Sequence, residues 1–328
     1  MQAGTDVDTP NPDGRPSGGY RLELSESVAE GVRRMAHEEV DGALARLREP
    51  RYDANEALHD ARTRLRKDRA LLRHVQDAVG IELFEAEDAA YKEAAGLLDD
   101  ARESFVAVRT VSGLREDFTE VLRPSAFVDL QARLEERHHR ILHHTLREGV
   151  VPQVIERVEA ARDRIETWPL DLADDRVLER GIRRAYERGY AAMARAYEPE
   201  AGLSGRAFRQ WRKEARYLWF QYRVLSPVWP PIFEAMADEQ LRLATALGVG
   251  KDLGDLKKLV REQDGLADTP WPLLALRGLA QERRRHLWAG LRPQGMQLDA
   301  ETPDAFRDRM RRILEAARGP TSSTHRGD

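Results

Sequence analysis

Apolar residues recur at helical spacing along almost the whole chain, and this periodicity constrains the fold more than any other feature. In the first such segment, Val28 and Val32 share one face, and Ser25, or Ser27 with Glu30 three residues later, can begin the helix. Further helices are predicted at about 54–79, 82–99, 114–122, 126–148, 153–166, 174–196, 205–225, 232–247, 252–264, 273–289 and 303–318. Proline or glycine separates these segments, and strand signals are scarce. The sequence therefore predicts an all-α protein with antiparallel helical neighbours.

Two related segments lie 150 residues apart. The basic segment ALHDARTRLRKDRALL matches FRQWRKEARYLWFQY, and downstream LLDDARE and LGVGKDL each place a leucine four residues before a basic–acidic pair. The repetition predicts an internal duplication, with pseudo-symmetric helical bundles at 19–168 and 169–318. The flanking segments 1–18 and 319–328 are poor in apolar residues and are predicted to be disordered tails.

The first basic segment places its cations on one helical face. His59, Arg62, Arg66, Arg69 and Arg73 follow one another at steps of 3, 4, 3 and 4 residues. Like charges at this spacing destabilise a helix unless an acidic neighbour or an anionic ligand neutralises them. A second stripe in the other half carries Arg206, Arg209, Arg212, Lys213, Arg216 and Arg223. An acidic helix could neutralise one stripe, but two equivalent stripes favour a shared groove for a multiply charged phosphate chain.

Composition narrows the classes of function. The chain has 328 residues and no cysteine, which excludes disulfides, thiolate metal sites and a cysteine nucleophile. Its net charge of −4 predicts no polyanion partner by itself, but the basic residues comprise 47 arginines and 6 lysines, and arginine pairs bidentately with phosphate. No apolar run is long enough to span a membrane and no signal peptide is recognised, so we expect a cytoplasmic protein without a membrane partner.

Motifs for catalysis are missing from the sequence. It contains no P-loop, no G-x-S-x-G and no carboxylate cluster spaced for two metal ions, so we expect a binding protein rather than an enzyme, without a cofactor. His139 and His143 have a spacing that can share a metal, but Arg137 and Arg140 would repel a cation, and no metal site is expected. Gly248-Val249-Gly250 follows no strand and is predicted to be a helix end rather than a dinucleotide loop.

The histidine and the basic ladder that follows it, repeated in a second half, resemble the conserved-histidine α-helical domain, or CHAD, family. The second copy, FRQWRKEARYLWFQYRVL, is similar to the family's His-Glu-Trp-Arg-Lys variant. ERGIRRAYERGYAAMARA resembles the family segment before it, and LDAETPDAFRDRMRRI resembles the family's C-terminal end. The resemblance covers roughly residues 20 to 318.

The resemblance implies two pseudo-symmetric bundles around a basic cavity that binds inorganic polyphosphate, in some members at polyphosphate granules. The ligands it implies are His59, Arg62, Arg66, Lys67, Arg69, Arg102, Arg212, Lys213, Arg216 and Lys251. Arg209, at the histidine position of the second copy, and Arg183, in a nearby basic cluster, complete the predicted set. Tyr190 and Tyr217 stand where basic residues are frequent in the family.

Three other functions remain open at this point. Nucleic-acid binding would use aromatic side chains among the charges, as Trp211 and Trp219 could provide. A hydrolase of short polyphosphates or triphosphate would release phosphate with a divalent metal. A purely structural helical scaffold would use the stripes for stability alone.

Overall fold

The computed structural model describes residues 19–49, 53–123, 125–170, 175–198, 204–262 and 265–317. The predicted tails, 1–18 and 319–328, lie outside the described residues. The described part is built of α-helices with short 3-10 turns and has no strand, which confirms the all-α prediction. None of its helices is sufficiently long and apolar to cross a membrane.

The helices follow one another with short connections. They are α1 (Val28–Arg48), α2 (Ala54–His74), α3 (Gln76–Val79), α4 (Ile81–Gly96), α5 (Asp99–Asp117), α6 (Val128–Arg147), α7 (Val150–Arg164), α8 (Asp175–Ala196), α9 (Gly205–Val224), α10 (Pro230–Glu262), α11 (Pro270–Leu298) and α12 (Pro303–Ala317). The 3-10 helices η1 (Ile165–Thr167) and η3 (Ser226–Val228) follow α7 and α9.

The predicted start of the first helix is confirmed in detail. The Ser27 hydroxyl accepts a hydrogen bond from the Glu30 N–H at 3.2 Å, and the Glu30 carboxylate accepts one from the Ser27 N–H at 2.8 Å. This is the reciprocal capping box, which satisfies two backbone donors at the helix start. Asp53 caps α2 by accepting a hydrogen bond from the Asn55 N–H at 2.8 Å.

Helix α5 was mostly missed by the periodicity, which predicts no helix between residues 99 and 114. Val106, Val108 and Val111 are β-branched and lower the helix propensity of this segment. The structure nevertheless forms a helix there because Val111 is fully buried in a core that α5 shares with α6, α10 and α11. Tertiary burial outweighs local propensity at this element.

Two predicted breaks in the second half are also wrong. Helix α10 runs through Gly248 and Gly250 without interruption. Helix α11 continues through Pro293, where the sequence predicts an end. Pro293 and Ala289, four residues before it, are both exposed, so water can bind the Ala289 carbonyl that loses its helical partner.

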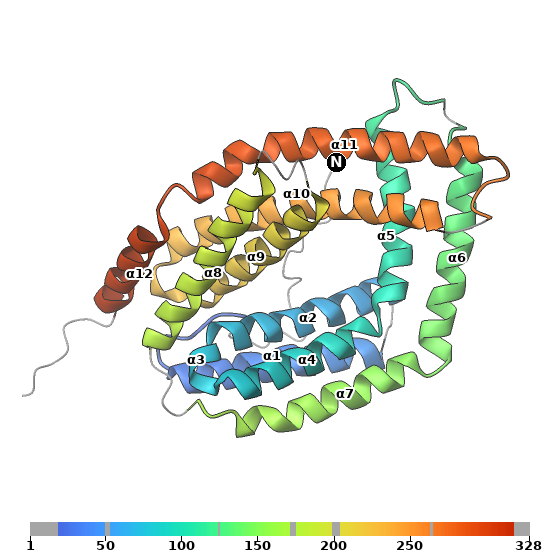
Figure 1. Cartoon of the computed structure of the whole chain (residues 1–328). Coiled ribbons are helices and arrows are strands. Elements are labelled where there is room, and N and C mark those ends of the chain that lie inside the picture. The colour runs from blue at the N-terminus through green and yellow to red at the C-terminus, as the bar shows by residue number, and fades with distance from the viewer. Residues whose placement is uncertain are drawn as a thin grey trace, which may run out of the picture.

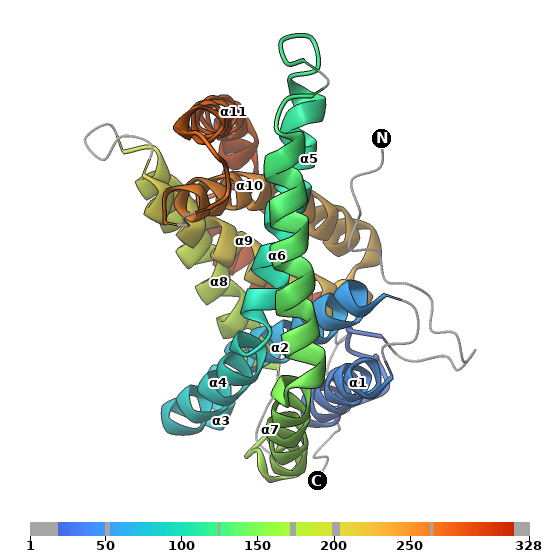
Figure 2. The same ribbon diagram turned by 90° about the vertical axis from the view of Figure 1, so that its right-hand side faces the viewer.

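The two sequence halves share their cores. Helices α1 to α4 and α7 lie on one side of the molecule and α8 to α11 on the other, while α5 and α6 run between them at one end (Figure 1; Figure 2). One core combines α1, α2, α4 and α7 with α8, α9 and α12. Within it, Tyr20 packs edge-on against Phe220 with ring centroids 5.7 Å apart. The halves are therefore joined by apolar packing as well as by the chain.

Helix bounds in the two halves correspond at the offset that the repeat predicts. Adding 150 to the bounds of α2 gives 204–224, and α9 spans Gly205–Val224. The same shift takes α7 to 300–314, close to α12 at Pro303–Ala317. This correspondence supports the predicted duplication, which itself stays a prediction.

Candidate anion-binding site

The two basic helices α2 and α9 pack against each other. Tyr217 of α9 lies at their contact, with the Arg73 guanidinium carbon 4.4 Å and the Lys213 ammonium 6.0 Å from its ring centroid. Tyr217 is itself buried, so its ring supports the cations of both helices. The Tyr217 ring thus contacts a cation from each of the two basic helices.

An acidic helix neutralises one end of the first stripe. The guanidinium of Arg69 donates to both carboxylate oxygens of Asp88 on α4, with Nε–Oδ1 and Nη2–Oδ2 distances of 3.0 Å. The Arg73 Nε lies 3.8 Å from the same carboxylate. Arg62, at the other end, pairs with Asp99 at the start of α5. The alternative of a stripe neutralised by neighbouring acids is therefore correct for these three arginines.

Four arginines from three helices form a group that we call the central cluster: Arg62 of α2, Arg102 of α5, and Arg212 and Arg216 of α9. Burial lowers the pKa of Arg102. The carboxylate of Asp252 partly reverses this shift, whereas the cation of Arg62 lowers the pKa of Arg102 further. Burial likewise lowers the pKa of Arg212 to about 10, and the cations of Arg216 and Arg102 lower it as well. Arg102 is therefore close enough to Arg62, Arg212 and Arg216 to be repelled by each of them, and Asp252 of α10 lies near Arg102 and Arg212.

Arg212 is the most confined member of the central cluster. Its Nε is buried and has no hydrogen-bond partner among the described residues. A Cβ on Gly248 of α10 would lie 3.3 Å from this nitrogen, so the guanidinium passes directly over the glycine. Because buried N–H donors are usually paired, an acceptor supplied from outside the chain would fit here.

Opposite charges on helices α5 and α10 face each other where the two helices are in contact. The acid of each sequence pair faces the base of the other: Asp252 opposes the pKa shift of Arg102, while Lys251 opposes the upward pKa shift that burial causes in Glu103. Lys251 also forms an ion pair with Asp255. The two downstream basic–acidic pairs that the repeat singled out therefore meet in space.

Several predicted ligands point elsewhere. Lys67 is buried against α1, where its ammonium lies 3.1 Å from Glu39 and 5.4 Å from the Tyr20 ring centroid. Arg209 lies near Arg284 of α11. Burial lowers the pKa of Arg284, and the cation of Arg209 lowers it further. These two cations are not part of the central cluster.

Arg183 of α8 lies 3.7 Å from Glu187 on its own helix. Its neighbour Arg184 instead donates to Asp77 at 2.7 Å and to the Arg73 carbonyl at 3.4 Å. His59 and Arg66 lie half-buried on α2, and their spacing puts them on the face that carries Arg62.

Two residues outside the predicted ligand set, Arg188 and Asp252, lie near the basic helices. Burial lowers the pKa of Arg188 on α8. The carboxylate of Glu214 partly offsets this shift, and the cation of Arg73 lowers the pKa of Arg188 further. The sequence groups Arg183, Arg184 and Arg188 on one helix as a basic cluster that could extend the groove, and Arg184 and Arg188 share a face at i and i+4. Asp252 was noted only as half of a repeated pair, because its place among the arginines depends on how α10 docks.

Trp211 and Trp219 are 2% and 3% exposed, respectively, so they are core residues and not platforms for bases. Among the described residues, no three His, Asp or Glu side chains are grouped to hold a metal ion.

The CHAD domain family model matches residues 34–261. The chain belongs to the CHAD domain family. The matched range contains the central cluster and all of the predicted ligands, while α11 and α12 lie beyond it. Among solved structures, this CHAD protein is similar to PptA from Streptomyces chartreusis, with a TM-score of 0.57 and 17% identity over 84% of this chain and 100% of that chain. That likeness supports the fold of this CHAD protein. None of the curated proteins compared matches it.

Proposed function

We propose that this CHAD protein binds inorganic polyphosphate without catalysis, on the surface that α2, α5 and α9 share. The central cluster carries the proposal, because it brings four arginines together with the half-buried Asp252 beside two of them, Arg102 and Arg212. It also leaves the buried Arg212 Nε without a hydrogen-bond partner among the described residues. Clustered guanidinium groups bind phosphate oxygens bidentately, and a chain of phosphates can engage several of them at once. Counterions released from the polyanion would add an entropic contribution.

The decisive experiment is a titration with labelled long-chain polyphosphate at two salt concentrations. The test variant is Arg62→Glu/Arg66→Glu/Arg212→Glu/Arg216→Glu. We expect tight, salt-sensitive binding by the wild type, and a Kd at least about tenfold higher in the variant with a smaller salt dependence. Circular dichroism must show that the variant keeps its helical content.

A charge-matched control removes the effect of net charge. Arg242, Arg285, Arg311 and Arg312 are all exposed, and their replacement by glutamate changes the net charge by the same amount. This control should bind polyphosphate within about twofold of the wild type, because exposed charges beyond a Debye length are screened. Equal losses in both quadruple variants would reject a defined site on α2 and α9.

Two further measurements separate the remaining alternatives. Single-stranded nucleic acid of matched charge should compete weakly, because the tryptophans proposed for base stacking are buried. Incubation with short polyphosphates and Mg²⁺ or Mn²⁺ should release no phosphate if the function is binding alone. Fluorescence microscopy of the tagged protein in polyphosphate-accumulating cells would test association with granules, which we propose as the cellular setting.

A further inference from the structure

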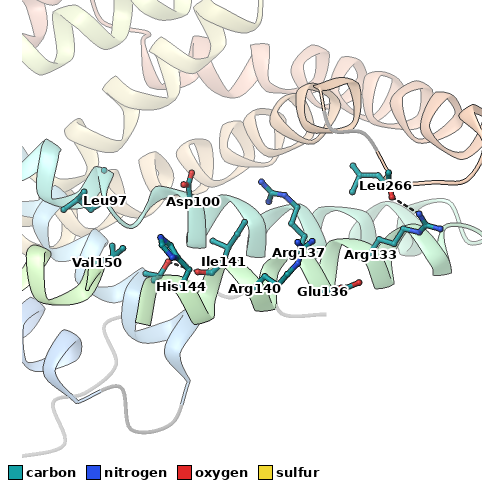
Figure 3. Close-up of a pocket in the computed structure, with 13 residues that line it drawn as sticks. Leu97, Asp100, Arg133, Glu136, Arg137, Arg140, Ile141, His144, Val150 and Leu266 are labelled. Carbon is teal, nitrogen blue, oxygen red and sulfur yellow. Dashed lines mark hydrogen bonds between the residues drawn. The ribbon is translucent and has the colours of Figure 1, made fainter. Parts of the chain in front are cut away.

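A second cationic surface lies on α6. Arg133, Arg137, Arg140 and His144 line an open cavity of about 870 Å³ between α6, the α4–α5 junction and the segment at Gly265 (Figure 3). Their steps of 4, 3 and 4 residues put all four side chains on one helical face. The cavity thus has a row of three arginines and one histidine along one wall.

Four apolar side chains form another part of the wall, which also contains Thr145. Leu97 at the α4–α5 junction, Ile141 of α6, Val150 of α7 and Leu266 line the same cavity. Leu266 belongs to the core shared by α5, α6, α10 and α11 and is 5% exposed, so this part of the lining is rigidly packed. A cavity of a few hundred cubic ångströms with an apolar lining and a few convergent polar groups is typical of sites for small molecules.

The three arginines in the cavity differ in whether they have ion-pair partners. Arg133 is held by the Gly265 carbonyl at 2.7 Å and by Asp268 at 2.5 Å, and it ties α6 to the segment that closes one end. Arg137 and Arg140 form no ion pair within the part of the chain that the structure describes. These two guanidinium groups are therefore available to an anion from solution.

Two carboxylates share the cavity with the arginines. Asp100 and Glu136 also line the cavity, but neither forms an ion pair with Arg137 or Arg140 among the described residues. His144 is paired with Glu148 on its own helix, with a distance of 2.7 Å between Nδ1 and Oε2. Three arginines and two carboxylates line the cavity, so the arginines outnumber the acids by one.

The cavity is separate from the central cluster. Asp100 lines the cavity and Arg102 belongs to the cluster, and two residues turn a helix by about 200°. The two surfaces therefore lie on nearly opposite sides of α5. Inorganic polyphosphate has no apolar part and would leave the leucine and isoleucine lining unused.

We propose that this cavity binds a small organic anion. Arg137 and Arg140 hold its phosphate or carboxylate head, and its apolar body packs on Leu97, Ile141 and Leu266. The head explains two arginines that form no ion pair with any described residue, and the body explains the apolar side chains in the lining. This inference does not depend on polyphosphate binding.

The test uses 1-anilinonaphthalene-8-sulfonate as probe, since it joins an anionic group to an apolar ring system. Its fluorescence is titrated against the full-length protein and the variant Arg137→Glu/Arg140→Glu. We expect saturable binding at one site in the wild type and a Kd at least about tenfold higher in the variant. The control Arg147→Glu/Arg195→Glu changes the charge equally at exposed positions outside the cavity and should bind like the wild type.

A steric variant tests the place of binding without altering charge. Gly96 lines the cavity, and a Cβ on it would meet no atom within 4 Å, so Gly96→Phe can be introduced without a clash on the backbone side. It should also weaken probe binding at least about tenfold while the thermal midpoint stays that of the wild type or higher, since glycine is a poor helix former. Unchanged binding by both cavity variants would overturn the proposal.

Competition identifies the kind of anion. Octyl phosphate and octanoate should displace the probe, and the stronger competitor defines the head group. Displacement by inorganic polyphosphate but by neither amphiphile would overturn the proposal and make the cavity an extension of the polyphosphate surface. The quadruple variant of the central cluster should still bind the probe, so loss of polyphosphate binding and loss of probe binding are separable.

Discussion

Asp252 stands among the arginines of the central cluster, where it acts as an internal counterion. Burial raises its pKa, and the cations of Lys251 and Arg212 counteract that rise. A polyphosphate chain must compete with this carboxylate for Arg212. We therefore expect Asp252→Asn to lower the Kd for polyphosphate severalfold and, because the arginines lose their counterion, to lower the thermal midpoint of the free protein.

The pH dependence of binding gives a second readout for the same variant. Protonation of Asp252 removes the competing charge, so the wild type should bind more tightly as pH falls, and Asp252→Asn should lose this part of the dependence. Titrations across pH 5 to 8 would measure it. Asp308→Asn, at a partly exposed carboxylate on α12 that pairs with Arg307, should show the pH dependence of the wild type. If Asp252→Asn bound polyphosphate more tightly without a lower thermal midpoint, or had a lower thermal midpoint without tighter binding, the counterion role would be contradicted.

His74 is fully buried where α2 meets α8, and its Nε2 lies 3.1 Å from the Leu178 carbonyl, to which it must donate. Burial lowers the pKa of His74 to about 4. The unfolded state binds the proton more readily, so this group's contribution to stability is present above about pH 6.5 and is lost as pH falls towards 4. Urea unfolding should show a loss of up to about 3 kcal/mol over this window.

The matching variant for that prediction is His74→Gln, which keeps a donor for the Leu178 carbonyl but does not titrate. Its free energy of unfolding should depend less on pH between 4 and 6.5 than that of the wild type. The same slope in both proteins would show that other groups cause the acid sensitivity.

Helix α10 packs closely against α9 and α11 at Gly248 and Gly250, two glycines for which the sequence predicts a helix end. A Cβ on Gly250 would lie 2.4 Å from the Trp288 Nε1, and Trp288 is held by stacking on Phe208 with ring centroids 4.0 Å apart. Gly250→Ala should therefore destabilise the protein by about 1–3 kcal/mol through overpacking. In contrast, Gly290→Ala on the exposed side of α11 meets nothing within 4 Å and should be neutral or stabilising by up to about 1 kcal/mol. Thermal and urea unfolding of the pair would check the sign of each change.

At the same scale, the sequence predicts most helices and fails where packing decides. The start of α2 and the bounds of α8 and α9 follow from apolar periodicity and capping residues, which are local. The predicted end of the second helix at 79 is wrong, because α2 ends at His74 and the short helix α3 begins at Gln76. The glycines at 248 and 250 interrupt local propensity, but they allow α9 and α11 to approach α10 closely. Valine-rich α5 is likewise stabilised by burial that its own residues do not reveal.

The candidate site likewise has features that the sequence predicts and features that depend on packing. Helical spacing correctly groups Arg62, Arg66 and Arg69 on one face. It does not show that Lys67, adjacent in sequence, turns to Glu39, or that Asp252 from a distant helix enters the cluster. Contacts between elements depend on how the helices dock, and no local pattern encodes them.

Over the whole molecule, charge is segregated. The net charge is −4, yet the central cluster concentrates four arginines at the meeting of the two halves. Outer faces carry exposed ion pairs such as Arg162–Asp41 and Arg48–Glu159. These exposed pairs contribute little stability but keep the surface hydrated, so a positive site and an acidic protein are compatible.

Because each half supplies part of the cluster, both halves should act on one bound polyphosphate. Arg62→Glu/Arg66→Glu alters α2 alone, and Arg212→Glu/Arg216→Glu alters α9 alone. With one shared surface, each pair should weaken binding while the number of sites stays that of the wild type, and their effects on binding free energy should not add in the quadruple variant. Calorimetric titration with polyphosphate of uniform length gives affinity and stoichiometry together. If each half instead bound its own chain, either pair variant would retain a site of wild-type affinity at half the stoichiometry, and the contact between α2 and α9 would serve folding rather than binding.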